Sequence, residues 1–409
     1  MYAYARVHER VDAALAAYSA PTLRRLEITV PYGSPHLTSD RVSSWLRFAS
    51  RRLAGDLLLS LPHRVPDGDR EEILIPPCQR ATAIHIEHVR RTLRFLPLLP
   101  VPVAGGGLAF AALATLRIKD ALVDSRELED VLSSRCPRLK ELALEYVTLR
   151  DGPAVFSISS GSLQRLEVAS SDEFGGLLRV AAPELQVLTQ QFISCDAYIA
   201  APKLSQLYWY DLCYDPSRHR FAEAGRHLRR MKVTTGTPSM ALMKRFDIVD
   251  ELDLTLYVPQ GVQQYEKLLE DTSKLAKCCE ALVLRFMVVN HEFKPILVHL
   301  LQQCHGIRKL SVEFNSTMGD YPCKSWGCPC SRLENRKTNL LHSLEEVQVK
   351  GGGDEADHKA ELVRMLCKCH ATFKKKVSIS VQGNTYTRER ICRFVPPNDK
   401  YEITVSSVL

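Results

Sequence analysis

The sequence lacks the features of a secreted or membrane-embedded protein. Its first residues carry Arg6, Glu9, Arg10 and Asp12 among the apolar ones, so the continuous hydrophobic region of a secretory signal is missing. One uncharged stretch, 95–116, is long enough to cross a bilayer, but prolines and a glycine triplet within it would break a spanning helix. We therefore expect an intracellular protein of the cytoplasm or the nucleus, without membrane contact.

Cysteine and net charge are also low. The chain has 13 cysteines among 409 residues, an odd count and far below the density of disulfide-stapled secreted scaffolds, so reduced and buried thiols are expected. Basic residues outnumber acidic ones by 54 to 47, and the resulting +7 is weaker than a dedicated nucleic-acid-binding protein carries. A hydrophobic content of 45% and a charged content of 25% are instead those of a folded globular protein.

One phrase recurs along the chain: Leu, two residues, Leu, one residue, then Leu, Ile or Val. Between 113 and 249 its copies are 19 to 26 residues apart, which is the period of leucine-rich repeats. The last two anchors of each phrase are two residues apart, so they point to the same side of a short strand. The pattern predicts an α/β leucine-rich repeat solenoid, a curved parallel sheet with helices and loops on its outer side. The clear copies are Leu23/Leu26/Ile28, Leu113/Leu116/Ile118, Leu139/Leu142/Leu144, Leu163/Leu166/Val168, Leu204/Leu207/Trp209, Leu228/Met231/Val233, Val249/Leu252/Leu254, Ile307/Leu310/Val312 and Leu344/Val347/Val349.

The segments that return from one strand to the next are expected to differ along the chain. Apolar residues at helical spacing predict outer helices over 125–136, 260–278 and 292–304. Residues 150–203 are rich in Ser, Gly, Ala and Pro, which favours short irregular returns. Cysteines that end a helix just before a phrase, such as Cys136, are interpreted as small apolar residues that fill the bend between helix and strand.

The pattern changes after the last phrase. A helix is expected with Leu362 and Leu366 on its apolar face, followed by strands that begin near Val377 and Tyr401. The lysine run 374–376 is interpreted as a solvated cap at the negative end of the helix dipole, in preference to an anion site. These changes predict three parts, which are a helical segment at 1–20, the repeat solenoid at 21–339 and a C-terminal α/β cap at 340–409.

Several stretches are more distinctive than the repeat phrase itself. They are Cys136-Pro-Arg-Leu-Lys-Glu-Leu-Ala-Leu, Ala201-Pro-Lys-Leu, Trp326-Gly-Cys-Pro-Cys330, Leu344-Glu-Glu-Val-Gln-Val-Lys-Gly, Glu361-Leu-Val-Arg-Met-Leu and Lys374-Lys-Lys-Val-Ser-Ile. With these stretches the chain resembles the plant F-box/leucine-rich repeat proteins that have a C-terminal FBD domain, especially the large set found in grasses. The similarity spans nearly the whole chain, and 340–383, the FBD-like part, is its most specific portion.

The resemblance implies a substrate receptor of an SCF-type ubiquitin ligase. In such a receptor an F-box binds the Skp-type adaptor and the repeats hold the target. An F-box needs roughly 40 to 50 residues of helices of ordinary length, whereas the first phrase here begins at Leu23. This departure puts binding of the Skp-type adaptor by this chain in doubt, while target recognition by the repeats stays the expected role. Two alternatives stay open, an F-box-less adaptor or competitor that binds the same targets, and a truncated gene model.

A catalytic or cofactor-binding constellation is not recognisable in the sequence. The glycine triplets at 105–107 and 351–353 lack the pattern that cradles phosphate in nucleotide-binding loops. The candidate zinc ligands form C-x-C rather than C-x-x-C pairs, so packing or loop thiols are favoured over a metal site. Those candidates are Cys323, Cys328, Cys330, His342, Cys367, Cys369 and His370. We expect a binding protein that is not an enzyme and that has no cofactor and no metal.

The predicted binding surface is the concave face of the sheet, where the residues between and beside the anchors point outward. Tyr208, Tyr210, Arg230 and Lys232 stand there on neighbouring phrases and combine aromatic with cationic side chains, the types enriched in interface hot spots. They form the candidate site for an unidentified target protein, and the alternative is an ordinary solvated ladder of mixed charges. Mixed signs along the face argue against a nucleic acid as partner. Trp209 replaces the usual Leu or Ile anchor and is expected to be buried.

Overall fold

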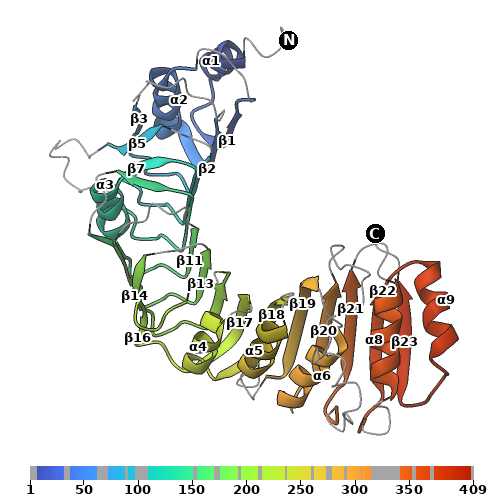
Figure 1. The fold of residues 1–409 in the computed structure, drawn as a ribbon. Coiled ribbons are helices and arrows are strands. Elements are labelled where there is room, and N and C mark those ends of the chain that lie inside the picture. The colour runs from blue at the N-terminus through green and yellow to red at the C-terminus, as the bar shows by residue number, and fades with distance from the viewer. Residues whose placement is uncertain are drawn as a thin grey trace. The chain divides into compact units, whose positions relative to one another are not determined.

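The computed structural model describes most of the chain and divides into two compact units (Figure 1). The N-terminal unit comprises Met1–Leu204 and Ser217–Ala224, and the C-terminal unit comprises Ser205–Pro216 and Gly225–Leu409. The described residues are 7–31, 37–61, 72–87, 91–96, 109–150, 154–169, 176–191, 195–210, 214–234, 237–258, 262–272, 279–289, 293–304, 306–314, 341–351, 356–368 and 373–406.

The N-terminal unit is built on a parallel sheet in which each strand carries a pair of buried anchors. Its strand order is β1-β2-β4-β6-β8-β11-β13, so the sheet grows in chain order. The bounds are Leu23–Thr29 for β1, Leu53–Ser60 for β2, Ala83–Glu87 for β4, Thr115–Lys119 for β6, Glu141–Glu145 for β8, Arg165–Ala169 for β11 and Val187–Gln191 for β13. One row of cross-strand partners, at most 9% exposed, consists of Leu26, Leu57, Ile84, Leu116, Leu142, Leu166 and Leu188. The stacked anchors confirm the strand assignment of the phrases in this unit.

The return segments of the N-terminal unit form two further parallel sheets, with orders β3-β5-β7-β9 and β10-β12-β14-β16. The bounds are Glu72–Ile75 (β3), Thr92–Phe95 (β5), Leu122–Asp124 (β7), Thr148–Arg150 (β9), Val155–Ser159 (β10), Leu177–Ala181 (β12), Asp196–Ala200 (β14) and His219–Ala222 (β16). The prediction of irregular returns over 150–203 is therefore wrong. Successive return segments lie side by side, with Phe156, Leu178 and Ala197 as cross-strand partners in one row. Pairing between these strands provides hydrogen-bond partners for backbone groups that would otherwise be buried without them.

In its described residues this unit contains the helices α1 (Val7–Ala17), α2 (Ser39–Arg52) and α3 (Ser125–Asp130), and α3 continues into the π-helical turn Val131–Arg135. The expected helix over 125–136 is confirmed. Asp124 caps α3 by accepting a hydrogen bond of 3.0 Å from the backbone N–H of Glu127. In α2 the indole N–H of the buried Trp45 donates to Asp12 of α1 at 2.6 Å, which holds the two helices together.

The C-terminal unit contains one parallel sheet of order β15-β17-β18-β19-β20-β21-β22-β23. The bounds are Gln206–Trp209 (β15), His227–Thr234 (β17), Ile248–Val258 (β18), Ala281–Val289 (β19), Lys309–Phe314 (β20), Glu346–Gly351 (β21), Val377–Gln382 (β22) and Tyr401–Ser406 (β23). One row of partners, buried at every position except the last, consists of Leu207, Met231, Leu252, Leu282, Leu310, Val347, Ile379 and Ile403. The two expected C-terminal strands thus extend the sheet of the repeats.

Helices cover one face of this sheet (Figure 1). They are α4 (Thr237–Arg245), α5 (Val262–Thr272), α6 (Phe293–Gln303) and α8 (Ala356–Lys368), and α9 (Thr385–Phe394) packs beside α8. The rings of Phe293 on α6 and Phe314 on β20 pack edge to face at 5.1 Å, so the covered face is the one that carries the anchors. The opposite face, here called the open face, carries the residues between the anchors and corresponds to the concave face expected from the sequence.

Helix α8 confirms the expected C-terminal helix, with Leu362 and Leu366 fully buried. Its buried Lys359 donates to the carbonyl oxygens of Gly351 and Gln382 at 2.9 and 3.0 Å, which ties the helix to the ends of β21 and β22. The lysine run 374–376 does not end this helix, which stops at Lys368, but lies directly before β22. Its interpretation as a helix cap is therefore wrong.

Some residues singled out in the sequence lie outside the described ranges. These are 97–108 of the uncharged stretch and Cys323, Trp326, Cys328, Cys330, Cys369 and His370. Cys136 is described and buried, as expected, and burial raises the pKa of its thiol to about 12, so the thiol stays protonated at neutral pH. The helices of the described ranges include no segment that is both long and apolar enough to cross a membrane.

Candidate protein-binding site

The four residues selected from the sequence meet on the open face of the C-terminal unit. Strands β15 and β17 are parallel neighbours, and their register places Gln206 beside Arg230 and Tyr208 beside Lys232. Tyr210 follows the last residue of β15 and alternates with the buried Trp209, so it lies on the same face as Tyr208. All four side chains are half-buried. We call Tyr208, Tyr210, Arg230 and Lys232 the tyrosine–arginine patch.

Both tyrosine rings of the patch are held by neighbouring side chains. The hydroxyl of Tyr208 donates to Gln206 Oε1 at 2.9 Å. The ammonium of Lys232 lies 5.0 Å from the centre of the Tyr210 ring, within the range of a cation–π contact. Trp209 beneath them is 1% exposed and packs edge to face on Tyr214 at 5.4 Å, so its expected place in the core is confirmed. The rings therefore stand on a rigid base.

Arg230 is oriented by an ion pair but remains accessible. Its Nη2 donates to Glu251 on the next strand, and its side chain is 41% exposed. Burial acts to lower the pKa of the Arg230 guanidinium, but the hydrogen bonds with Glu251 and Tyr208 outweigh burial and raise the pKa. Its buried Nε has no hydrogen-bond partner among the described residues. The guanidinium is thus fixed in direction while part of it still faces the solvent.

A second arginine extends this network across the next three strands. Arg285 on β19 donates through Nε and Nη2 to the two carboxylate oxygens of Asp253 on β18, both at 3.0 Å, and through Nη1 to Glu313 on β20 at 3.0 Å. The Asp253 side chain is only 4% exposed. The hydrogen bond with Asp253 raises the pKa of the Arg285 guanidinium, and burial opposes this shift. The pair has the parallel two-bond geometry that makes arginine–carboxylate contacts strong and directional.

Sequence reasoning did not select Arg285 because the phrase around it is a weak copy, with Cys279 where the first anchor should be Leu. A usable signal was nevertheless present. Arg285 follows the second anchor of its strand, Leu284, by one residue, as Glu313 follows Val312. Applying the same offset to weak copies of the phrase would have selected it.

The charges around the patch balance within the protein. Three cations, Arg230, Lys232 and Arg285, stand on the open face with three carboxylates, Glu251, Asp253 and Glu313, which gives a net charge of 3 − 3 = 0. A ligand would therefore be recognised through the tyrosine rings and individual hydrogen bonds. Long-range attraction by net charge would contribute little.

The open face of the N-terminal unit contains a carboxylate in an unfavourable setting. Lys119 pairs with Glu145 at 3.3 Å and Arg165 with Glu141 at 3.7 Å. Glu167, in contrast, is half-buried, and burial together with the nearby charge of Glu145 raises its pKa. Because the folded-state pKa of this acid lies above the unfolded-state value, ionisation of Glu167 at neutral pH opposes folding.

Replacing Glu167 by glutamine is therefore expected to stabilise the N-terminal unit at pH 7, by up to about 0.5 kcal/mol, the scale of exposed charge interactions. The difference between variant and wild type should shrink as the pH falls through the folded-state pKa and vanish below the unfolded-state pKa, at about 4. Urea unfolding at both pH values measures it. Glu184→Gln, which removes the exposed pair with Lys203, is the control and should not be stabilising at pH 7. A Glu167→Gln protein that is less stable than wild type at pH 7 would contradict the inference that the ionised Glu167 opposes folding.

Stacked parallel strands at repeat spacing, with one face covered and the other open, define a leucine-rich repeat protein, a class of protein-interaction module. Residues 42–242 match the family model described as "FBD-associated F-box protein At5g56370, LRR repeats". In these residues the chain is therefore similar to the repeats of F-box/LRR/FBD-type proteins. No curated protein matches it.

Proposed function

We propose that the open face of the C-terminal unit binds a target protein through the tyrosine–arginine patch. The observation that carries the proposal is that two tyrosine rings, held by Gln206 and Lys232, share this face with Arg230, whose side chain is oriented by Glu251 yet 41% exposed. Tyrosine and arginine are the residues most enriched among hot spots of protein interfaces, and rigid rings lose little entropy on binding. The chain acts in this proposal by binding and not by catalysis, and without a cofactor or metal.

In the cell, this binding would select substrates for an SCF-type ubiquitin ligase in the cytoplasm or nucleus of a plant. Support for this role comes from the match of residues 42–242 to a family model that is described by the name of an FBD-associated F-box protein. The second candidate is an adaptor that binds the same targets without recruiting the ligase and so competes with receptors that do.

Replacing both Tyr208 and Tyr210 by alanine is expected to weaken target binding at least about tenfold, since hot-spot truncations typically cost 2 kcal/mol or more. Affinity purification from the source tissue, with the wild-type and the variant chain as parallel baits, identifies proteins that only the wild type captures. The affinity of each captured protein for both chains is then measured with purified components. Tyr386→Ala on α9, which removes a tyrosine that is 53% exposed, is the matched control and should retain the targets. Equal capture of the same targets by the wild type and both variants would show that the tyrosine–arginine patch does not bind them.

The two roles differ in adaptor binding. Co-purification of the chain with a Skp-type adaptor, next to an F-box-containing relative as positive control, supports the receptor role. Target binding without adaptor retention supports the competitor role. Sequencing the transcript upstream of Met1 adds an independent check, because an in-frame F-box there would restore the receptor role.

A further inference from the structure

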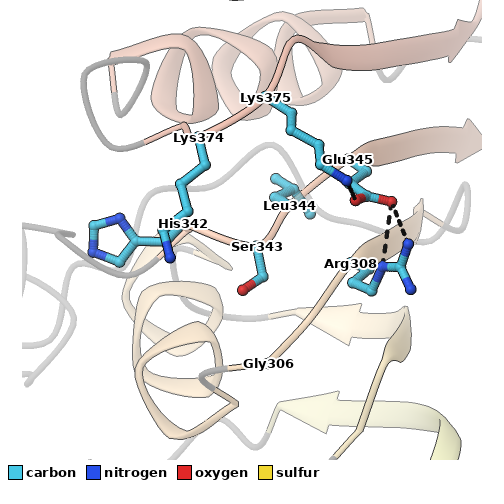
Figure 2. Close-up of a pocket in the computed structure, with 8 residues that line it drawn as sticks. All are labelled: Gly306, Arg308, His342, Ser343, Leu344, Glu345, Lys374 and Lys375. Atoms are coloured by element: carbon cyan, nitrogen blue, oxygen red, sulfur yellow. Dashed lines mark hydrogen bonds and ion pairs between the residues drawn. The ribbon is translucent and has the colours of Figure 1, made fainter.

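A pocket of about 310 Å³ opens in the C-terminal unit at the end of the sheet where β20, β21 and β22 begin (Figure 2). Its polar lining comes from residues that precede these strands: Arg308 before β20, Ser343 and Glu345 before β21, and Lys374 and Lys375 before β22. The volume lies at the lower end of the range of roughly 300–1,000 Å³ that small-molecule sites occupy. The pocket is separate from the tyrosine–arginine patch and shares no residue with it.

One carboxylate organises two of the cations in this pocket. Arg308 donates through Nε and Nη2 to Glu345 Oε2 at 3.3 and 2.9 Å, and Lys375 donates to Glu345 Oε1 at 2.5 Å (Figure 2). The hydrogen bonds from Lys375 and then Arg308 lower the pKa of the Glu345 carboxyl, so it is ionised at neutral pH. Both cations are thereby held at the pocket wall, and each keeps N–H groups that Glu345 does not use.

The third cation, Lys374, has no acidic partner among the described residues. Lys374 forms no ion pair and no hydrogen bond with the part of the chain that the structure describes, and its side chain extends toward Ser343 and His342 (Figure 2). Its neighbour Lys376 is instead paired with Glu402 at 2.8 Å. Three cations and one carboxylate leave the lining with a charge of 3 − 1 = +2, not counting His342.

We propose that this pocket binds a phosphate group, either free phosphate or the phosphorylated side chain of a protein partner. Phosphate carries a charge of about −1.5 to −2 at pH 7 and has three strong acceptor oxygens, which match the +2 lining and its remaining donors. Those donors are the ammonium groups of Lys374 and Lys375, the unused N–H groups of Arg308 and the hydroxyl of Ser343. A carboxylate ligand would leave one positive charge unmatched.

The convergence of these groups depends on strand register. Arg308, Glu345 and Lys375 are 30 or more residues apart in the sequence and become neighbours because β20, β21 and β22 are parallel and start at the same edge. Parallel pairing places the entry turns of successive strands at one edge of the sheet, so charged residues that precede these strands gather into one site. The lysine run therefore acquires a role that its own segment does not reveal.

Calorimetric titration of the full chain with inorganic phosphate tests the proposal. The wild type should bind saturably, and Lys374→Gln should bind about five- to tenfold more weakly, the effect of losing one charge-assisted hydrogen bond. The matched control is Lys350→Gln, which removes an exposed lysine near the other end of β21 and should leave the affinity unchanged. Glu345→Gln raises the lining charge to +3 and should bind phosphate more tightly. Absent saturation, or equal affinities of the Lys374→Gln and Lys350→Gln proteins, would overturn the proposal.

A second titration distinguishes the two sources of the phosphate group. Its ligands are a short peptide containing phosphoserine and the same peptide without the phosphate. Tighter binding of the phosphopeptide than of inorganic phosphate, lost in Lys374→Gln, identifies a phosphorylated partner. Equal affinities for the phosphopeptide and for inorganic phosphate identify free phosphate as the ligand. Binding of the unphosphorylated peptide with the same affinity as the phosphopeptide would overturn the assignment of the pocket to phosphate.

Discussion

Replacing Arg285 by methionine is expected to lower the unfolding free energy of the C-terminal unit by about 3 kcal/mol, the lower end of the range for breaking a buried ion pair. The reason is the environment of Asp253, whose side chain is 4% exposed and receives both of its strong hydrogen bonds from Arg285 at 3.0 Å. Without the guanidinium this carboxylate stays buried without its charge partner. Equilibrium unfolding in guanidinium chloride, followed by circular dichroism, measures the cost.

Two further variants separate this explanation from a general effect of losing an arginine. In the double variant Asp253→Leu/Arg285→Met both charges are gone, so much of the lost stability should return. Arg226→Met removes an arginine that is 70% exposed and paired with Asp247, and it should cost less than about 1 kcal/mol because exposed pairs contribute little. Equal costs for Arg226→Met and Arg285→Met would show that Asp253 does not depend on Arg285.

Replacing Gly55 by alanine is expected to destabilise the N-terminal unit by about 3 kcal/mol or more, at the upper end of overpacking effects. A Cβ at this position would lie 1.9 Å from the backbone carbonyl oxygen of Arg24 on the adjacent strand. The atom in the way belongs to the backbone, so β1 and β2 would have to separate next to the irregularity between Leu23 and Arg25. Thermal unfolding gives the stability, and hydrogen exchange of the β1 amides reports whether the strand pair opens.

Gly161→Ala is the matched control for this effect. No heavy atom lies within 4 Å of the Cβ that the substitution would add, so this variant should be neutral or slightly stabilising, by at most about 1 kcal/mol through a less flexible unfolded chain. A Gly55→Ala protein as stable as the Gly161→Ala protein would show that β1 and β2 are not as close as the structure has them.

Two strands of the N-terminal unit, β2 and β4, were not predicted by the repeat phrase, and their sequences show why. In β4 the anchors Ile84 and Ile86 follow Ala81, which takes the first position but is not leucine. In β2 the spacing from Leu53 to Leu57 is one residue longer than the phrase allows, because the extra residue is absorbed where the register with β1 shifts. Both strands have two buried residues that are two positions apart, as a strand of the repeat requires. They were missed because their sequences do not match the exact Leu-based phrase.

The sheets formed by the return segments could not be read from composition. Ser, Gly, Ala and Pro have low strand propensity, and residues 150–203 contain many of them. Strands β10, β12 and β14 form there because each return lies against the next one, so that backbone groups find partners on a neighbouring return. This pairing depends on the stacking of whole repeats, which no single segment encodes.

The repeat and the face of the patch were determined by the sequence alone, because a period of two along a strand decides which side chains are buried and which point outward. Tyr208, Tyr210, Arg230 and Lys232 could be selected on that basis. The pairing of Arg285 with Asp253 and the pocket between Arg308, Glu345 and Lys375 were decided only by the tertiary structure. These contacts cross between strands more than 25 residues apart, so they depend on register and on the length of every return, which local periodicity does not constrain.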